Sequence, residues 1–564
     1  MILEKIKVFY DRESPWVRPG RVWLKWYPKE VPRRIEYPIM PIYEVLDDIA
    51  EEFPNNVAIN FVPKEKKYTY KEFCEASNKI ANELYERGLK RGDAVAIMTG
   101  NVPEYFFSQF GILRTGAGVI PINPLLRTKE VNHIIQDSQI IKAIIIQDNL
   151  YKIVKDAISL IDNVIVIGEP MENSISFREI LHRQSKRLHF EKPEIRPKED
   201  LAALLYTGGT TGLPKGVFLT HYNALTNILQ AFYLRESEEI LHQKRGKSTY
   251  VQILPVCHSF GFATSLLSIF AGSMILLYDR FDPGAVLEAI ESHKVEYFAG
   301  VVTMYKMFLA HPDFGKYDLS SIKVLLAGAG PLPFEIAKKI QEKTGLIAVQ
   351  GYGLTECVAV ACLQPPWFPP NPKSVGIPII DTDVKIVDPE TLTELEPDMQ
   401  GEILIRGPQV MKEYFNNPEA TDRVLIKDGE GNTWLRTGDI GKMDRDGLFY
   451  IVGRTKEMIK YKGYRILPRE VEETLYEHPA VLECAVIGVP DELTGENIMA
   501  YIVLRKEYRG GKISEDEIIN WAKERMAAYK YPRIIKFVRL IPKTPIGKID
   551  RQELKRKISR SRKI

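Results

Sequence analysis

Short apolar runs recur from residue 94 onward, and the stretches between them carry apolar residues at helical spacing. A short apolar run bounded by turn residues is typical of a buried strand. Strands that alternate with helices predict mostly parallel sheets covered by helices on their faces. Before this alternation, residues 42–52 and 70–88 have the periodicity of helices. The runs that we expect to form strands are 94–98, 119–122, 143–146, 164–167, 201–206, 252–255, 274–277, 297–302 and 324–327.

The pattern differs at both ends of the chain. Residues 1–40 are rich in Arg, Pro and Trp and predict an irregular, extended arm. From about 375 to 448 the strand-like runs become short and turn signals become dense, which is typical of a small antiparallel barrel or sandwich. Past Gly453 the pattern indicates a compact α+β segment with a basic tail. We therefore predict an α/β protein with a large N-terminal domain (1–453, barrel subdomain about 375–450) and a small C-terminal α+β domain (454–564).

Composition narrows the class of protein. The hydrophobic share of 45% is ordinary for a globular protein, and a net charge of +3 argues against a general nucleic-acid binder. The five cysteines form no CxxC pair, so we expect reduced thiols in the cytoplasm. No signal peptide is expected, because the N-terminal residues 1–13 lack a long apolar stretch. No transmembrane segment is expected, because the most apolar region, 265–278, is too short to span a bilayer. Many Ile, Lys, Glu and Arg with few Gln favour a thermophilic source.

The strongest chemical signal is the run Tyr-Thr-Gly-Gly-Thr-Thr-Gly-Leu-Pro-Lys-Gly-Val at 206–217. Glycines let backbone amides approach a ligand, and successive amides with hydroxyls form an anion-binding concavity. Lys215 adds a positive charge at the end of the loop. The spacing is not that of the ordinary P-loop, in which the lysine directly follows a glycine and precedes Ser or Thr. Following the apolar run 201–206, the segment predicts a phosphate-binding loop that leaves a strand.

Three other stretches are ambiguous when each is taken alone. Residues 350–356, Gln-Gly-Tyr-Gly-Leu-Thr-Glu, offer a ring for a base, a hydroxyl for a phosphate and a carboxylate for Mg²⁺, but such a run is also a simple turn. Asp439 could accept ribose hydroxyls, although Gly-Asp is common in turns. Lys548 follows a glycine in a proline-bounded loop, where a plain surface lysine is the simpler interpretation.

Together, these stretches resemble in order and spacing the acyl-adenylate-forming superfamily, which includes acyl-CoA synthetases, nonribosomal adenylation domains and beetle luciferases. The resemblance covers about residues 40 to 550 and includes the segments 255–262, 327–333 and 453–465. Gly209, where many members have serine, makes the loop most similar to that of long- or medium-chain fatty-acid–CoA ligases.

The resemblance implies two mostly parallel sheets, a small β-barrel and a mobile C-terminal domain. It also implies two half-reactions: a carboxylate and ATP form acyl-AMP and pyrophosphate, and CoA then displaces AMP. Chemistry at phosphorus needs positioning and charge neutralisation rather than a protein nucleophile, in keeping with the lack of a Ser-His-Asp pattern. ATP, CoA and Mg²⁺ are thus the expected small-molecule partners. In the preferred interpretation the acid is a medium- or long-chain fatty acid.

Roles for particular residues follow from the same resemblance. Lys548 neutralises charge in the first step, Thr355 binds the α-phosphate, and His258 flanks the acyl pocket or simply packs as a structural histidine. Thr207 and Glu356 carry Mg²⁺. Asp439 and Arg454 bind ribose, and Lys456 lies at the hinge of the small domain. The other predicted nucleotide- or CoA-binding residues are Gly208, Gly209, Thr210, Thr211, Gly212, Lys215, Gly328, Ala329, Gln350, Gly351, Tyr352, Gly353, Lys460 and Gly463.

Alternatives within the superfamily stay open from the sequence. The chain could activate another acid, such as a short hydroxy acid or an aryl acid, or load a carrier protein, although no carrier-like domain follows residue 564. A luciferase-like oxygenase would need a specialised pocket that the sequence does not indicate. The Trp-rich arm at 1–40 could reach a second subunit, which suggests a homodimer.

Overall fold

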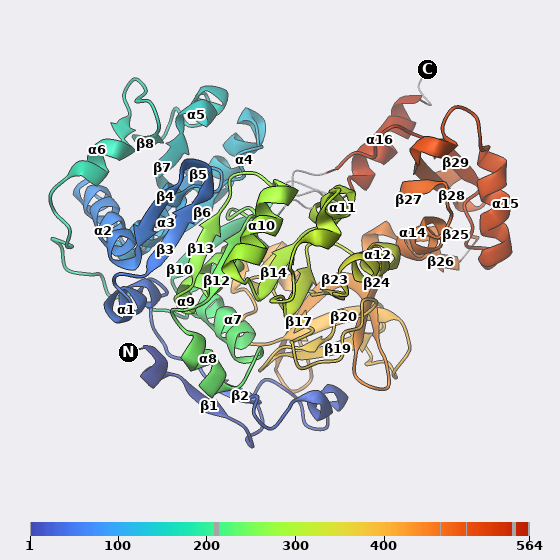
Figure 1. The fold of residues 1–564 in the computed structure, drawn as a ribbon, viewed down its shortest axis with the longest axis horizontal. Coiled ribbons are helices and arrows are strands. Elements are labelled where there is room, and N and C mark those ends of the chain that lie inside the picture. Colours follow the sequence, from blue (N-terminus) through green and yellow to red (C-terminus); the bar gives the residue numbers. More distant parts are fainter. Residues whose placement is uncertain (1, 208–213, 463, 492, 544–548, 562–564) are drawn as a thin grey trace.

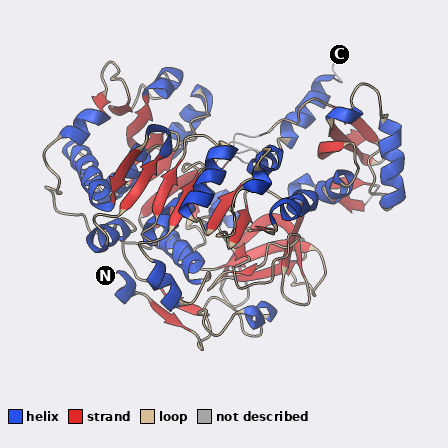
Figure 2. Cartoon of the chain, in the orientation of Figure 1, coloured by secondary structure: helices blue, strands red, loops and turns tan. Residues whose placement is uncertain are grey.

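The computed structural model describes residues 2–561 except 208–213, 463, 492 and 544–548. Figure 1 shows a large body, coloured blue to orange, and a smaller body in orange and red at the C-terminal end. In Figure 2 the helices of the large body lie on the faces of its sheets, as the alternating sequence pattern predicts. None of the helices within the described ranges is both long and apolar enough to cross a bilayer.

An eight-stranded sheet forms the N-terminal part of the large body. Its strands are arranged in the order β21-β11-β10-β6-β5-β7-β8-β9, parallel from β10 to β9 and antiparallel at β11 and β21. Their bounds are β5 (Ala94–Met98), β6 (Gly118–Pro121), β7 (Ile141–Gln147), β8 (Asn163–Ile167), β9 (Ile175–Ser176), β10 (Leu201–Thr207), β11 (Lys215–Thr220) and β21 (Glu413–Tyr414).

The remaining mostly parallel strands form a four-stranded and a three-stranded sheet, with β12 and β14 beside each other. The four-stranded sheet contains β12 (Thr249–Gln252), β13 (Met274–Leu277), β3 (Val57–Phe61) and β4 (Lys66–Thr69). The three-stranded sheet contains β14 (Tyr297–Gly300), β15 (Val324–Ala327) and β16 (Ala348–Gln350), all parallel. The carboxyl ends of these three strands therefore meet at one edge of the sheet.

Some predicted strands end earlier than the apolar pattern suggests. The strand predicted at 297–302 ends at Gly300, because a helix begins at Val302. The largest difference is at 252–255. The run 252–255 is buried up to Leu254, yet β12 ends at Gln252. The reason is that side chains replace the neighbouring strand: Asn101 donates to the Leu254 carbonyl at 3.1 Å and accepts from the Val256 amide at 3.1 Å. An apolar run can therefore be buried without pairing to another strand, and the sequence pattern alone does not distinguish the two cases.

Helices cover these sheets, and the ones near the chain start have clear local signals. Helix α2 begins with a capping box in which Thr69 and Glu72 bond to each other's backbone amides. The helices of the large body are α1 (Glu44–Glu52), α2 (Tyr70–Glu86), α3 (Pro103–Arg114), α4 (Thr128–Ser138), α5 (Asp148–Val154), α6 (Phe177–His182), α7 (His221–Tyr233), α8 (Glu238–Lys244), α9 (Ser259–Phe270), α10 (Pro283–His293), α11 (Val302–Ala310), α12 (Phe334–Thr344) and α13 (Pro418–Val424).

The region of dense turn signals folds as antiparallel strands, as the sequence predicts. A five-stranded sheet contains β19 (Asp383–Val387), β20 (Gly401–Arg406), β23 (Thr433–Met443), β22 (Leu425–Lys427) and β24 (Phe449–Arg454). A two-stranded ladder of β17 (Cys362–Leu363) and β18 (Ile377–Pro378) leads into it. Strand β24 runs directly to the start of the small body.

The N-terminal arm is not free but packs against this antiparallel sheet. It contains β1 (Lys7–Phe9), the short helix η2 (Val22–Trp26) and β2 (Arg34–Glu36). The ring of Trp23 is buried at 5.6 Å from the ring of Phe449. Arg21 Nε lies 2.8 Å from the carboxylate of Asp383, which is inaccessible to solvent. The described arm is thus engaged within its own chain.

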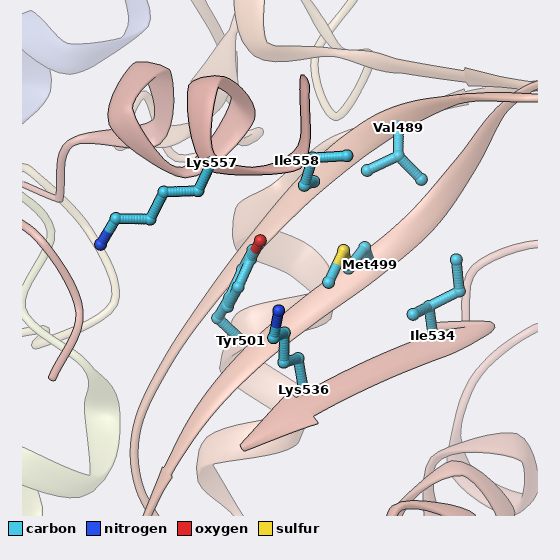
Figure 3. A pocket seen from close by; sticks show the side chains of 7 residues that line it. All are labelled: Val489, Met499, Tyr501, Ile534, Lys536, Lys557 and Ile558. Carbon is cyan, nitrogen blue, oxygen red and sulfur yellow. The ribbon is translucent and has the colours of Figure 1, made fainter. Parts of the chain in front are cut away.

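The small body is a sheet packed between helices. Its strands are β25 (Ile459–Tyr461), β26 (Tyr464–Ile466), β27 (Val481–Asp491), β28 (Gly495–Leu504) and β29 (Ile534–Phe537), and its helices are α14 (Pro468–Tyr476), α15 (Glu515–Arg525) and α16 (Arg551–Ser561). Figure 3 shows a shallow hollow between α16 and this sheet, lined by Val489, Met499, Tyr501 and Ile558 among others. None of the predicted site residues lines this hollow.

Candidate functional site

The described ends of the glycine-rich loop form the base of a hairpin. Thr207 at the end of β10 pairs with Lys215 at the start of β11, and its hydroxyl lies 3.5 Å from the Lys215 carbonyl. His133 of α4 fastens this base through its Nε2, which lies 2.9 Å from the Pro214 carbonyl. The loop thus joins two antiparallel strands, rather than a strand and a helix. Gly208, Gly209, Thr210, Thr211 and Gly212 lie outside the described residues.

Tyr414 connects the loop lysine with the acidic residue of the second motif. The Nζ of Lys215 lies 4.9 Å from the centre of the Tyr414 ring, and the Tyr414 hydroxyl donates to Glu356 Oε1 at 2.5 Å. Such a short distance is typical of a charge-assisted bond to a carboxylate. Burial and the neighbouring Glu356 raise the pKa of Tyr414, so the hydroxyl keeps its proton at neutral pH.

The carboxylate of Glu356 has the chemistry of a ligand for a hard cation. Its Oε2 accepts no hydrogen bond from the described residues, whereas Oε1 is held by Tyr414. Glu356 belongs to the short helix η5 (Thr355–Cys357), and the Met411 amide donates to its carbonyl at 2.8 Å. Carboxylate and hydroxyl oxygens suit Mg²⁺, which usually takes one or two carboxylates together with phosphates. The donor types of Glu356 and Thr207 therefore fit this ion.

Positive charges converge on the base of the hairpin. Burial lowers the pKa of Lys215, the charges of Lys456 and Arg423 lower it further, and Glu356 acts in the opposite direction. Lys456 lies in η6 (Thr455–Glu457), at the junction of the two bodies, and Arg423 lies in α13. Ammonium and guanidinium groups that repel one another are stabilised by a polyanion, so this place suits phosphates.

A second cluster centres on Asp439. Its Oδ2 accepts a hydrogen bond from the Tyr352 hydroxyl at 2.8 Å, and its Oδ1 lies 2.9 Å from Arg454 Nε. Asp439 and Arg454 are also paired across β23 and β24, which fixes their backbones. Asp439 raises the pKa of Arg454, while burial, followed by Asp439, raises the pKa of Tyr352. The sequence therefore predicted three residues of one cluster from three separate motifs.

The ends of β15 and β16 are paired with each other, and Gln350 at the end of β16 lies two residues before Tyr352. A Cβ atom on Gly328 would lie 2.6 Å from the Phe260 ring, so this ring packs directly on the Gly328 backbone. Ala329 adopts a left-handed conformation with φ of 60°, which turns the backbone sharply away from the strand. The Gln350 side chain accepts from the Leu332 amide at 3.0 Å and donates to the Pro372 carbonyl at 2.7 Å. Gln350 thus supports the loops rather than pointing freely into the site.

Glycines are required where the second motif turns. A Cβ on Gly353 would lie 1.9 Å from the Ala359 carbonyl oxygen, which no side chain could tolerate. A Cβ on Gly351 would lie 3.0 Å from the Leu363 side chain. The close neighbours within the protein are enough to explain why Gly351 and Gly353 are glycines. They are evidence for the backbone geometry of this segment and not for contact of these two glycines with a ligand.

Thr355 meets the beginning of α9. Its Oγ1 lies 3.3 Å from Ser259 Oγ, and the preceding residue, His258, caps the helix by accepting from the Phe260 amide at 3.4 Å through Nδ1. The predicted α-phosphate residue and the predicted acyl-pocket residue are therefore brought together. Capping supplies His258 with a structural task in addition to any role in the reaction.

The predicted residues of the small body are only partly described. Lys548 and Gly463 lie outside the described residues. The Lys460 amide donates to Glu496 Oε2 at 2.7 Å, and the neighbouring Tyr464 ring stacks on Tyr529 at 4.3 Å. In this orientation Lys460 and Tyr464 make these contacts within the small body itself.

Sequence reasoning missed Tyr414 and Ser259, which contact predicted site residues. Ser259 directly follows His258 within the 255–262 segment, so assigning a role to each polar residue of that segment would have included it. Tyr414 lies on the edge strand β21, far along the chain from both Lys215 and Glu356, and its local sequence, Glu-Tyr-Phe-Asn, has no feature of a site. Only the pairing of β21 with β11 brings it to the site.

The arrangement brings together several cations, a buried carboxylate held by two partners (Asp439), and the start of a helix beside apolar residues. It also includes a second carboxylate, that of Glu356, with one oxygen that accepts no hydrogen bond from the described residues. The cations suit phosphates, and a buried carboxylate such as Asp439 suits the hydroxyls of a sugar. The site therefore has the donor types needed for a nucleoside triphosphate and an apolar cosubstrate.

Two family models and several known ligases match this chain, and together the matches cover nearly its whole length. Residues 46–415 match the model of the AMP-binding enzyme family, and residues 470–548 match that of the AMP-binding enzyme C-terminal domain. A long-chain-fatty-acid–CoA ligase of Bacillus subtilis (strain 168) is 38% identical over 94% of this chain and 97% of its own length. The ligase of the same description from Salmonella typhi is 33% identical over 95% and 98%. The crystal structure of the anthranilate CoA ligase AuaEII with anthranoyl-AMP superposes with a TM-score of 0.83 at 28% identity, covering 93% and 98%.

Proposed function

The chain belongs to the AMP-binding enzyme family, and we propose that within this family it is an AMP-forming fatty-acid–CoA ligase with a preference for medium- or long-chain acids. The observation that carries the proposal is the 38% identity, over 94% of the chain, to a long-chain-fatty-acid–CoA ligase. The enzyme joins a carboxylate to ATP as acyl-AMP with loss of pyrophosphate, and CoA then displaces AMP to give the thioester.

In the first half-reaction the protein holds its substrates and balances charge, because displacement at phosphorus needs no protein nucleophile. We assign Lys215 and the 207–216 loop to the β- and γ-phosphates, Thr355 to the α-phosphate, and Lys548 to the charge that develops between carboxylate and pyrophosphate. Asp439, held by Tyr352 and Arg454, accepts the ribose hydroxyls. The adenine base occupies the turns after β15 and β16.

Mg²⁺ is proposed as a partner of ATP. Glu356 and Thr207 would hold it, since the carboxylate has an oxygen that accepts no hydrogen bond from the described residues. When bound, the ion neutralises phosphate charge. Tyr414 keeps the Glu356 carboxylate in place through its hydroxyl.

The second half-reaction is proposed to follow a rotation of the small domain about Lys456. The rotation would withdraw Lys548 and bring Lys460 and Gly463 to the site, where a glycine permits close passage of the pantetheine arm. Domain boundaries at 453 and 454 are part of this proposal.

The acyl chain is proposed to lie beside the start of α9, near His258 and Phe260. The contact of the Phe260 ring with Gly328 places this apolar surface against the segment assigned to adenine. An apolar wall at that position is suited to an alkyl chain whose carboxylate reaches the α-phosphate. A cytoplasmic location, a thermophilic source and a homodimer stay predictions from the sequence.

A second candidate function is activation of an aryl acid. The observation in its favour is the fold similarity to an anthranilate CoA ligase at a TM-score of 0.83. Its 28% identity is lower than the 38% identity to the long-chain ligase, so the fatty acid is preferred. Loading of a carrier protein is a third alternative within the family.

Pyrophosphate release across a series of acids tests the assignment. The series contains saturated acids from two to eighteen carbons together with benzoate and anthranilate, each assayed with ATP and with or without CoA. Each buried methylene contributes about 0.8 kcal/mol, so kcat/KM should rise about fourfold per methylene until further methylenes are no longer buried. The highest kcat/KM with acetate or an aryl acid would refute the fatty-acid assignment.

A further inference from the structure

The carboxylate of Glu483 joins the two bodies away from the hinge. Lys306 Nζ of α11, in the large body, lies 3.1 Å from Glu483 Oε1 of β27, in the small body. Lys543 Nζ lies 3.0 Å from the same oxygen. Figure 1 shows α11 on the side of the large body that faces the small one. A single carboxylate thus binds one lysine from each body.

The surroundings make this contact stronger than an ordinary surface ion pair. The side chain of Glu483 is 13% exposed, compared with 26% for Lys306 and 29% for Lys543. The Lys306 ammonium also lies 5.9 Å from the centre of the Tyr476 ring. Burial would raise the pKa of Glu483, but the two lysines outweigh burial and hold the pKa below its usual value. Partly desolvated charges are screened less by salt than exposed ones.

A rotation of the small body would affect the two ion pairs of Glu483 differently. Glu483 and Lys543 both belong to the small body, so their pair would move as a unit. Lys306 belongs to the large body, so its pair with Glu483 exists only in orientations close to this one. Lys543 pairs with Ile549 at the base of the loop that contains Lys548. The shared carboxylate therefore ties the base of this loop to α11.

We propose that Glu483 is a positioning residue that stabilises the adenylate-forming orientation of the small domain by binding Lys306 and Lys543 together. The inference rests on the proposed function, because it assumes two half-reactions carried out in two orientations. The Lys306–Glu483 pair favours acyl-AMP formation and must break before thioester formation. Neither residue needs to touch a substrate.

The two half-reactions measured separately test this role. The variants are Glu483→Gln and Lys306→Met, and the matched controls are Lys294→Met and Asp318→Asn, which break an ion pair of 2.7 Å within the large body. Acyl-AMP formation should slow about five- to tenfold in the first two variants, since a partly buried pair is worth more than the exposed median. Thioester formation from supplied acyl-AMP and CoA should stay at the wild-type rate or increase. Both controls should match wild type in both assays.

A double-mutant cycle shows whether Lys306 and Glu483 act through each other. The double variant should be no slower in acyl-AMP formation than the slower of the two single variants. Because the pair is only partly desolvated, high salt should still weaken it and slow this step more in wild type than in Lys306→Met. If Glu483→Gln fails to fold, Lys306→Met, which changes only a partly exposed lysine, carries the test alone.

Two results would overturn the inference while leaving the proposed function intact. One is an equal change of both half-reactions in Lys306→Met, and the other is fully additive effects in the double variant. A wild-type protein that forms neither acyl-AMP nor thioester would instead refute the proposed function. The two failures are therefore distinguishable in the same set of assays.

Discussion

Replacing Asp439 with asparagine tests the proposed ribose site, because it removes a charge while nearly keeping the shape. The carboxylate is 7% exposed, and its partners include Tyr352 Oη at 2.8 Å and Arg454 Nε at 2.9 Å. Both partners donate. The asparagine side chain has one oxygen that can accept a hydrogen bond, whereas its nitrogen cannot accept one from Tyr352 or from Arg454. Asp439→Asn therefore loses at least one of the two bonds and weakens the other.

The expected magnitude follows from the bonds involved. A hydrogen bond to a charged group contributes about 1.5–3 kcal/mol. If the ribose hydroxyls also donate to Asp439, the nucleotide loses about 3 kcal/mol in the variant, which corresponds to about a hundredfold lower kcat/KM for ATP. Because ribose is bound equally before and during the reaction, the loss should be mainly a higher KM for ATP.

The assay is ATP–pyrophosphate exchange at saturating fatty acid, with ATP as the varied substrate. Asp444→Asn is a matched control: the Asp444 carboxylate accepts from the Tyr450 hydroxyl at 2.9 Å in the turn that follows β23. This control breaks the same type of bond away from the proposed nucleotide. A kcat/KM for ATP within threefold of wild type in Asp439→Asn would refute the ribose role. Equal losses in both variants would indicate a folding defect.

Three further perturbations have definite expected outcomes. Glu356→Gln should weaken the Mg²⁺ dependence of pyrophosphate release, because an amide holds this ion poorly, and an unchanged Mg²⁺ titration would remove Glu356 from the metal site. Lys548→Ala should lower acyl-AMP formation about a hundredfold yet leave thioester formation from supplied acyl-AMP near the wild-type rate, and loss of both steps would indicate misfolding. Burial lowers the pKa of His221 from 6.5 to about 4, so the unfolded chain binds its proton first as pH falls. The stability that His221 provides is thus complete above pH 6.5 and decreases by about 3 kcal/mol toward pH 4. Urea midpoints at several pH values measure this slope, which His221→Gln should flatten.

The sequence predicted strands best where both faces of a strand are buried. The runs 94–98, 274–277 and 324–327 coincide with β5, β13 and β15, because parallel strands covered by helices are apolar throughout. The boundary at 252–255 was wrong, because Asn101 pairs with the backbone there in place of a strand. That contact joins residues 153 positions apart, so no local pattern could reveal it.

The residues of the candidate site were likewise predicted where a local motif contains them and missed where only distant contacts bring them to the site. The segments 350–356 and 436–439 contain their chemistry in a few residues, and the structure brings Tyr352 and Asp439 into one hydrogen bond. Tyr414 and Lys306 have no such local signal. Their contacts depend on how an edge strand pairs and on how the small body docks, which are properties of the assembled fold.

The docking of the N-terminal arm has a consequence for synthesis of the chain. Arg18 binds Asp383, a partner 365 positions later, and Trp23 packs against Phe449. At about 5–20 residues per second, a ribosome needs roughly 20–70 s to add that length. During this interval the emerging arm has no surface to cover its tryptophans, and a chaperone or a protease can reach it. Protease treatment of ribosome-bound chains stalled before residue 383 should therefore remove an arm that the finished protein keeps. Arm retention in such stalled chains would show that it docks elsewhere first.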